Sequence, residues 1–331
     1  SLEMEMLRAF SGSDSASRAR AGRLMRAGSE ATLAQVEWSG TSFLDLDDAI
    51  VVAWFMTEQH RSAELRAVGY ITLAFLHMAK GQRVEAMAQL DASARLDPGA
   101  ALTTRALIYL APFQPAAPAT LRSLRTALRA YDAAAVPPAA SQTTWLAVHN
   151  GLHEEIRAYL LGLLDGHLRD VAPTVADLET FDVPTEVGTV VPDWRRGVLA
   201  SADWVAGDRV AALELLETME LEGWFPYMAA SPFVSLGRER FLLATLLEET
   251  GRTEEALRWY GTFKGLGPHD RIYIAPSHLR RARIHERLGN LDTAAEHYRA
   301  FIELWQDADP EFQPLVVEAR ARLGDVLDDE R

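Results

Sequence analysis

The fold of this chain is decided by a pattern that residues 241–260, FLLATLLEETGRTEEALRWY, show in full. A small residue, Ala244, is followed by Gly251, then by Ala256 and by the large apolar Tyr260. The same spacing returns as Ala74, Gly81, Ala86 and Leu90, as Ala200, Gly207, Ala212 and Leu216, and as Ala282, Gly289, Ala294 and Tyr298. Four occurrences of a four-point pattern are hard to obtain by chance, so the chain is expected to consist of repeats.

Each position of the pattern has a physical role in a hairpin of two helices. The Gly ends the first helix, because it adopts the left-handed backbone conformation without a steric penalty. The two Ala residues let the helices approach closely, and the Leu or Tyr fills the layer between neighbouring hairpins. A single hairpin cannot bury its apolar face, so hairpins of this kind stack. The sequence therefore predicts an all-α solenoid.

These units resemble tetratricopeptide repeats, which are about 34 residues long. The clear repeats are residues 67–100, 193–221, 237–264 and 275–306. The resemblance implies a right-handed α-α superhelix of antiparallel hairpins over residues 21–331, which a helix at residues 311–327 would cap. Residues 1–20 are predicted to contain an N-terminal helix and a flexible linker, SGSDSAS, at residues 11–17.

The pattern is weaker between the clear repeats. Residues 143–165 and 167–181 are predicted to form another hairpin, broken at Asp165-Gly166. Residues 101–110 and 119–135 are predicted to form a further hairpin with an enlarged turn. A helix within residues 45–60 is expected to pair with one within residues 21–36.

The composition of the chain argues against several classes of function. The formal net charge is −14, and the resulting acidic field opposes the binding of nucleic-acid phosphates. Because the chain has no Cys, disulfides, thiolate catalysis and cysteine–zinc sites are excluded. Lysine occurs only at Lys80 and Lys264, and this preference for arginine is typical of a GC-rich bacterial genome.

The sequence gives no sign of a membrane or secreted protein. The longest apolar runs, residues 49–56 and 70–76, fall far short of the about 20 residues that cross a bilayer. No signal-peptide pattern opens the chain. We therefore expect a cytoplasmic protein, although a start at Ser1 rather than Met is what a fragment of a longer protein would show.

Two clusters could carry metal chemistry. His149 and His153, with Glu154, have the spacing that places two imidazoles on one helix face. Asp45, Asp47 and Asp48 precede an apolar run, and the interpretation we favour is that they start and cap a helix. No third ligand accompanies the histidines, so neither a metal nor a cofactor is expected. A metal- or small-molecule-binding sensor or enzyme that uses one of these clusters stays as the alternative function.

The favoured function is binding of a protein or peptide partner. The resemblance implies that the first helix of each hairpin lines a concave groove, and an unusually long connection, residues 222–237, adds aromatic residues. Aromatic side chains and arginines are enriched at interface hot spots. The predicted partner-binding residues are Trp194, Trp204, Trp224, Phe225, Tyr227, Phe233, Arg238 and Arg283. The alternative is that these aromatic side chains seal the junction between two repeats.

The sequence as a whole also resembles the C-terminal repeat regions of bacterial serine/threonine kinases and transcriptional activators. Residues 307–327, DADPEFQPLVVEARARLGDVL, carry most of this resemblance. It implies a signalling scaffold with a kinase or regulator domain on the same longer chain as a partner. No kinase, nucleophile-elbow or phosphate-loop motif lies within the sequence, so the chain itself is predicted not to be an enzyme.

Overall fold

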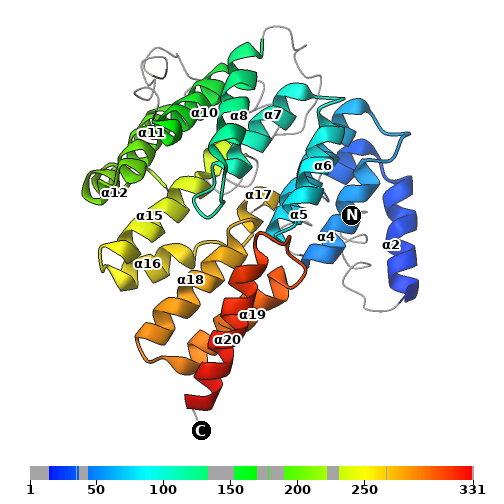
Figure 1. Cartoon of the computed structure of the whole chain (residues 1–331). Helices are drawn as coiled ribbons and strands as arrows, with labels where there is room; N and C mark the ends of the chain where they lie inside the picture. The colour runs from blue at the N-terminus through cyan, green and yellow to red at the C-terminus, as the bar shows by residue number, and fades with distance from the viewer. Residues whose placement is uncertain are drawn as a thin grey trace. The chain divides into compact units, whose positions relative to one another are not determined.

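The structure is a computed structural model that describes residues 15–34, 36, 44–132, 153–169, 178, 190–221, 231–265 and 267–329. These residues form helices and connecting turns without a β-strand, and helices adjacent in sequence pack in pairs (Figure 1). The prediction of an all-α solenoid of the tetratricopeptide type is confirmed. No helix among the described residues is both long enough and apolar enough to cross a bilayer.

The described residues divide into two compact units. Unit 1 contains those up to Pro98 and those from Phe263 onward, and unit 2 contains those from Gly99 to Thr262. The helices of unit 1 are α2 (Ser15–Ala27), α4 (Leu46–Met56), α5 (Ala63–Ala79), α6 (Arg83–Ser93), α17 (Pro268–Arg271), α18 (Ile274–Arg287), α19 (Leu291–Trp305) and α20 (Gln313–Asp329). The helices of unit 2 are α7 (Pro98–Tyr109), α8 (Pro118–Ala130), α10 (His153–Leu168), α11 (Val190–Ala206), α12 (Arg209–Glu217), α14 (Pro232–Ser235), α15 (Gly237–Glu249) and α16 (Thr253–Tyr260).

The four predicted hairpins are present as α5–α6, α11–α12, α15–α16 and α18–α19. Their turn glycines, Gly81, Gly207, Gly251 and Gly289, have φ angles of +71°, +94°, +83° and +75°. At each turn the amide after the Gly donates to a carbonyl five residues earlier, as Gln82 does to His77 at 2.9 Å. This bond belongs to the Schellman motif that ends many helices. The eight alanines of the pattern are fully buried, so their predicted place at the helix crossings is confirmed.

One predicted break is wrong. Helix α10 continues through Asp165-Gly166 to Leu168, and the left-handed residue that follows it is Arg169, with φ of +55°. Gly166 instead allows a close helix approach, since a Cβ there would lie 3.2 Å from the Cβ of Ala202 in α11. Asp165 is buried within the helix, where its carboxylate pairs with Arg125 of α8 at 3.2 Å. Tertiary contacts therefore override the local turn signal.

The N-terminal helices follow the prediction with one change. Helix α4 packs against α2, as expected for residues 45–60 and 21–36. Helix α2 begins at Ser15, so the last part of the predicted linker at residues 11–17 is helical, and the rest lies outside the described residues. The guanidinium of Arg61 donates to the carbonyls of Gly28 and Met25 at 2.8 and 2.9 Å, which satisfies the end of α2. The domain boundary proposed at residue 20 stays a prediction.

Unit 1 is held together by contacts between its first and last hairpins. The indole N–H of Trp305 in α19 donates to the carbonyl of Ala79 at 3.1 Å. The amide of Asp309 donates to the carbonyl of Gly81 at 3.0 Å, and its carboxylate accepts from the amide of Val84 at 2.8 Å. A linear repeat array has contacts between neighbouring repeats alone, so this closure is an addition to the repeat pattern.

Asp309 caps a helix that has no cap of its own. Gln82 occupies the N-cap position of α6 but makes no side-chain cap hydrogen bond. The carboxylate of Asp309, 225 residues away from Val84, accepts from a free amide of the first turn instead. The guanidinium of Arg83 pairs with Glu311 and lies 5.6 Å from the ring centre of Phe312. The predicted capping segment therefore acts on the first hairpin as well as on the last.

The turn glycines give a test of this closure. Gly289→Ala should lower the free energy of unfolding by about 1–2 kcal/mol, because the backbone at this position is left-handed. No further loss from crowding is expected, since nothing lies within 4 Å of the added Cβ. Gly81→Ala should cost about 1–3 kcal/mol more, because its Cβ would lie 2.7 Å from that of Ala308. Urea unfolding of both variants measures the difference. Equal losses would contradict the contact between the two hairpins.

The remote cap gives a second test. Asp309→Ala should lower the free energy of unfolding by about 1 kcal/mol, as the loss of an N-cap does. Asp307→Ala is the matched control, since Asp307 is exposed in the same turn. Thermal unfolding followed by circular dichroism measures both variants. A loss of similar size for Asp307→Ala would show that Asp309 acts only through general charge.

Candidate partner-binding site

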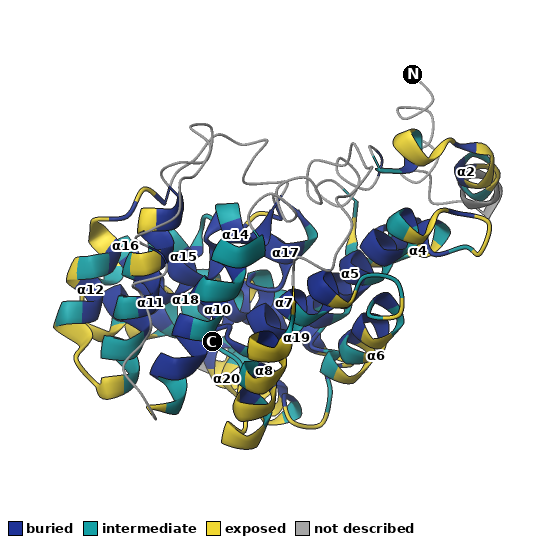
Figure 2. Cartoon of the chain, turned by 90° about the horizontal axis from the view of Figure 1, so that it is seen from above, coloured by how far each residue is buried: buried dark blue, intermediate teal, exposed yellow. Residues whose placement is uncertain are grey.

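Much of the face that α5 and α15 were predicted to turn toward a groove is buried by the chain itself. In the first hairpin, Phe75 packs against His269 of α17 with ring centres 6.1 Å apart. In the third, Phe241 packs against Phe113, in the turn after α7, with ring centres 5.5 Å apart. Figure 2 shows buried residues along most of α5 and α15. The sequence pattern identifies these faces as apolar but not which segments cover them.

Trp194 and Phe233 lie together in the interior of unit 2. The indole N–H of Trp194 donates to the carbonyl of Phe233 at 2.8 Å, and both side chains are at most 1% exposed. The ring of Tyr159 in α10 lies 5.5 Å from that of Trp194 and 6.5 Å from that of Phe233. The expectation that Trp194 and Phe233 face a partner is therefore corrected. They join α10, α11 and α14, as the alternative interpretation of the aromatic residues required.

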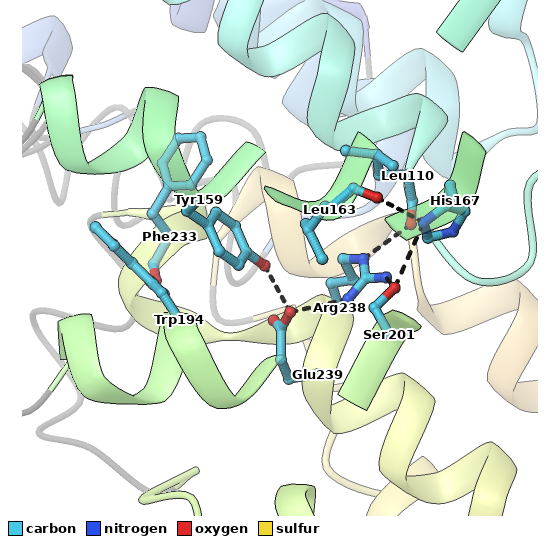
Figure 3. Close-up of polar contacts among 9 residues, drawn as sticks. All are labelled: Leu110, Tyr159, Leu163, His167, Trp194, Ser201, Phe233, Arg238 and Glu239. Carbon is cyan, nitrogen blue, oxygen red and sulfur yellow. Dashed lines mark hydrogen bonds and ion pairs between the residues drawn. The ribbon is translucent and has the colours of Figure 1, made fainter. Parts of the chain in front are cut away.

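Arg238 is also interior, at 1% exposure, and all three of its donor groups are used (Figure 3). Its Nε donates to the carbonyl of Leu110 at 3.0 Å, and its Nη2 donates to the hydroxyl of Ser201 at 2.6 Å. Its Nη1 pairs with Glu239 at 3.0 Å. The expected role of Arg238 at the charged edge of a surface is thus replaced by a role in joining α7, α11 and α15.

Glu239 completes the buried pair from the other side. Its Oε1 accepts from the hydroxyl of Tyr159 at 2.5 Å as well as from Arg238. Gly197 of α11 makes room for this carboxylate, because a Cβ there would lie 3.0 Å from Glu239 Cγ. A buried ion pair is tolerated when further hydrogen bonds satisfy both charges, and the second donor from Tyr159 meets this condition.

His167 borders the same cluster. Its Nδ1 donates to the carbonyl of Leu163 at 3.0 Å and lies 3.4 Å from the hydroxyl of Ser201. Burial and the charge of Arg238 lower the pKa of His167 to about 4, so the ring is neutral at pH 7. Because Nδ1 carries the proton, it cannot take one from Ser201, and the pair lacks the geometry of an activated nucleophile. The cluster is suited to fixing helices in place.

The other predicted residues are placed differently. Trp204, at the end of α11, is half-buried, and its ring lies 6.4 Å from that of His167. Arg283 belongs to unit 1, where it is half-buried and pairs with Glu318 of α20 at 2.7 Å. Trp224, Phe225 and Tyr227 lie outside the described residues.

No sequence motif singles out Tyr159, His167, Ser201 and Glu239. A signal was present in the run Arg238-Glu239-Arg240, three charged residues directly before the mostly apolar residues 241–247. All three are at most 2% exposed. A run of charged residues in a helix predicts either a face exposed to solvent or a buried network of ion pairs. The run alone does not show which of the two is present.

The structure describes all of the aspartate cluster that was considered for metal binding, but only part of the histidine cluster. Asp45 caps α4, since its carboxylate accepts from the amide of Asp48 at 2.8 Å, which confirms the capping interpretation. Asp47 pairs with Lys80 at 2.8 Å. His153 opens α10 beside Glu154, whereas His149 lies outside the described residues. Within the described part of the chain, no three His, Asp or Glu side chains are grouped so as to hold a metal ion.

Comparison with known proteins agrees with the hairpin pattern. The tetratricopeptide repeat family model matches residues 275–305, which span α18 and α19. This match covers the last of the four hairpins. No curated protein matches the chain.

The hydroxyl of Tyr159 tests the buried pair. Tyr159→Phe should lower the free energy of unfolding by about 1.5–3 kcal/mol, because it removes a hydrogen bond to a buried charged group. Tyr70→Phe is the control, since Tyr70 is half-buried and its hydroxyl makes no hydrogen bond within the described residues. Urea unfolding measures both. Similar values for the two variants would mean that Glu239 is satisfied by Arg238 alone.

Proposed function

We propose that this chain is a protein-interaction module that binds a peptide or protein partner. The observation that carries this proposal is the tetratricopeptide repeat match at residues 275–305, together with three further hairpins that share its turn geometry. Repeats of this architecture stack into extended surfaces that are used for binding. A soluble scaffold is also consistent with the acidic composition, which favours partners with basic surfaces.

The proposed contact residue with structural support in unit 2 is Trp204. It differs from Trp194 because its ring is half-buried and lies near the end of α11, next to the exposed residues of the α11–α12 turn. A partly exposed indole offers a large apolar area with one N–H donor, which is the usual anchor at an interface. We include Trp224, Phe225 and Tyr227 of the following connection in the proposed site on the strength of the sequence. Arg283 is proposed as a separate contact on unit 1.

The finer proposal is that the module belongs to a bacterial, cytoplasmic signalling protein with a kinase or regulator domain. The comparisons lend it no support, and its basis is the sequence style of residues 307–327. Asp309, Glu311 and Phe312 of this stretch contact the start of α6, so a structural role accounts for them. The coding sequence upstream of Ser1 tests the proposal, since a kinase or regulator domain there would support it.

Site-specific cross-linking tests the binding surface. A benzophenone side chain at position 204 should capture a partner from extract of the native cells, and the same group at position 259 should not. Trp259 is the matched control because it is also half-buried in unit 2. With the purified partner, Trp204→Ala should then weaken binding by about 30-fold, as the loss of a tryptophan hot spot does. Unchanged affinity in a folded Trp204→Ala variant would exclude this surface.

A further inference from the structure

Three histidines gather in the last hairpin of unit 1. His278 and His285 lie on α18, and His297 lies on α19. The ring centre of His297 is 5.0 Å from that of His278 and 5.7 Å from that of His285. The Nδ1 atoms of His278 and His297 are 2.9 Å apart. A hydrogen bond of this length requires one of the two nitrogens to be unprotonated, because two N–H donors cannot bond to each other.

The surroundings of the cluster disfavour further protonation. His297 is 9% exposed, and its Nε2 has no hydrogen-bond partner among the described residues. Burial, Arg281 and the two other histidines lower the pKa of His297 to about 3. Burial and Arg281 also lower the pKa values of His278 and His285. The hairpin therefore concentrates imidazoles around a permanent positive charge.

The charged groups of the adjoining helices are engaged at other points. On the α20 side, Glu318 pairs with Arg283 at 2.7 Å and Arg322 pairs with Glu286 at 3.3 Å, on a different face of α18. Glu286 also accepts from the hydroxyl of Tyr298 at 2.6 Å. On the α17 side, Asp270 accepts from the amide of Gly265, Arg271 donates to the carbonyl of Leu44, and the ring of His269 lies against Phe75.

We propose that the hairpin α18–α19 is an acid-sensitive latch of unit 1, which stays closed only while His278, His285 and His297 are neutral. Protonation of both His278 and His297 would bring two N–H donors together beside Arg281. Helix α19 also carries Trp305, whose indole donates to Ala79 of the first hairpin. Loosening of α19 in acid would therefore release the contact between the last and first hairpins. The inference does not rest on the proposed function.

The sign of the effect follows from the protons bound in each state. An unfolded histidine has a pKa of about 6.5, and the folded pKa of His297 is lower, so the unfolded hairpin binds more protons below pH 6.5. The contribution of neutral His297 to the stability of the hairpin is therefore fully present above about pH 6.5 and is lost as the pH falls toward 3. His167 would contribute in the same direction in unit 2, so the test needs a local measurement.

The first hairpin shows which uncharged residues can replace two of the histidines. Tyr70 and Gln89 occupy the positions of α5 and α6 that correspond to His278 and His297. The double variant H278Y/H297Q should therefore keep the hairpin packed while removing two titrating groups. His60→Gln is the control, since the side chain of His60 is 57% exposed.

Hydrogen exchange of the backbone amides of residues 275–305, corrected for intrinsic rates, is measured at pH 7.5 and 5.0. In the wild type and in His60→Gln, protection should fall about tenfold or more at pH 5.0, and in the double variant by less than about threefold. An equal loss in all three proteins would overturn the proposal. A nuclear magnetic resonance titration of the wild type gives an independent result, because titration of His297 near its ordinary pKa of about 6.5 would also overturn it.

Discussion

The close approach of two helices at a pair of buried alanines is the constraint on which each hairpin depends. Ala244 and Ala256 are both fully buried, and an alanine presents only a methyl group to the helix that packs against it. The left-handed glycine of the turn ends the first helix, and the second helix then packs back against it. A similar close approach joins α5 to the preceding helix α4, where a Cβ on Gly69 would lie 2.8 Å from Met56 Cβ. Within unit 2, α12 packs against α15, so a change in the crossing distance of one hairpin passes to the next.

The sequence was sufficient to predict the hairpins, because their determinants are local. The glycine, the alanines and the large apolar residue all lie within 17 consecutive positions, as from Ala244 to Tyr260. What covers the first helix of each hairpin could not be predicted. Phe75 is covered by His269, and Arg238 reaches Leu110, from segments that are distant in the sequence. Local periodicity shows that a face is apolar but does not identify its neighbour.

Three of the residues proposed for the candidate site are interior for a related reason. Trp194, Phe233 and Arg238 were selected because aromatic side chains and arginine mark the centres of interfaces. The same chemistry serves a buried junction, where an arginine can satisfy several acceptors and aromatic rings fill the space around it. Only the partners on other helices distinguish the two cases: Tyr159 of α10 donates to Glu239, and Ser201 of α11 accepts from Arg238.

The remote cap on α6 has a consequence for folding during synthesis. The amide of Val84 leaves the ribosome 225 residues before Asp309, which at about 5–20 residues per second is an interval of roughly 10–45 s. During that interval the first hairpin lacks both its cap and the indole of Trp305. Contacts this far apart in sequence also slow the final folding step. We therefore expect the apolar face of α5 to need protection by a chaperone during that interval.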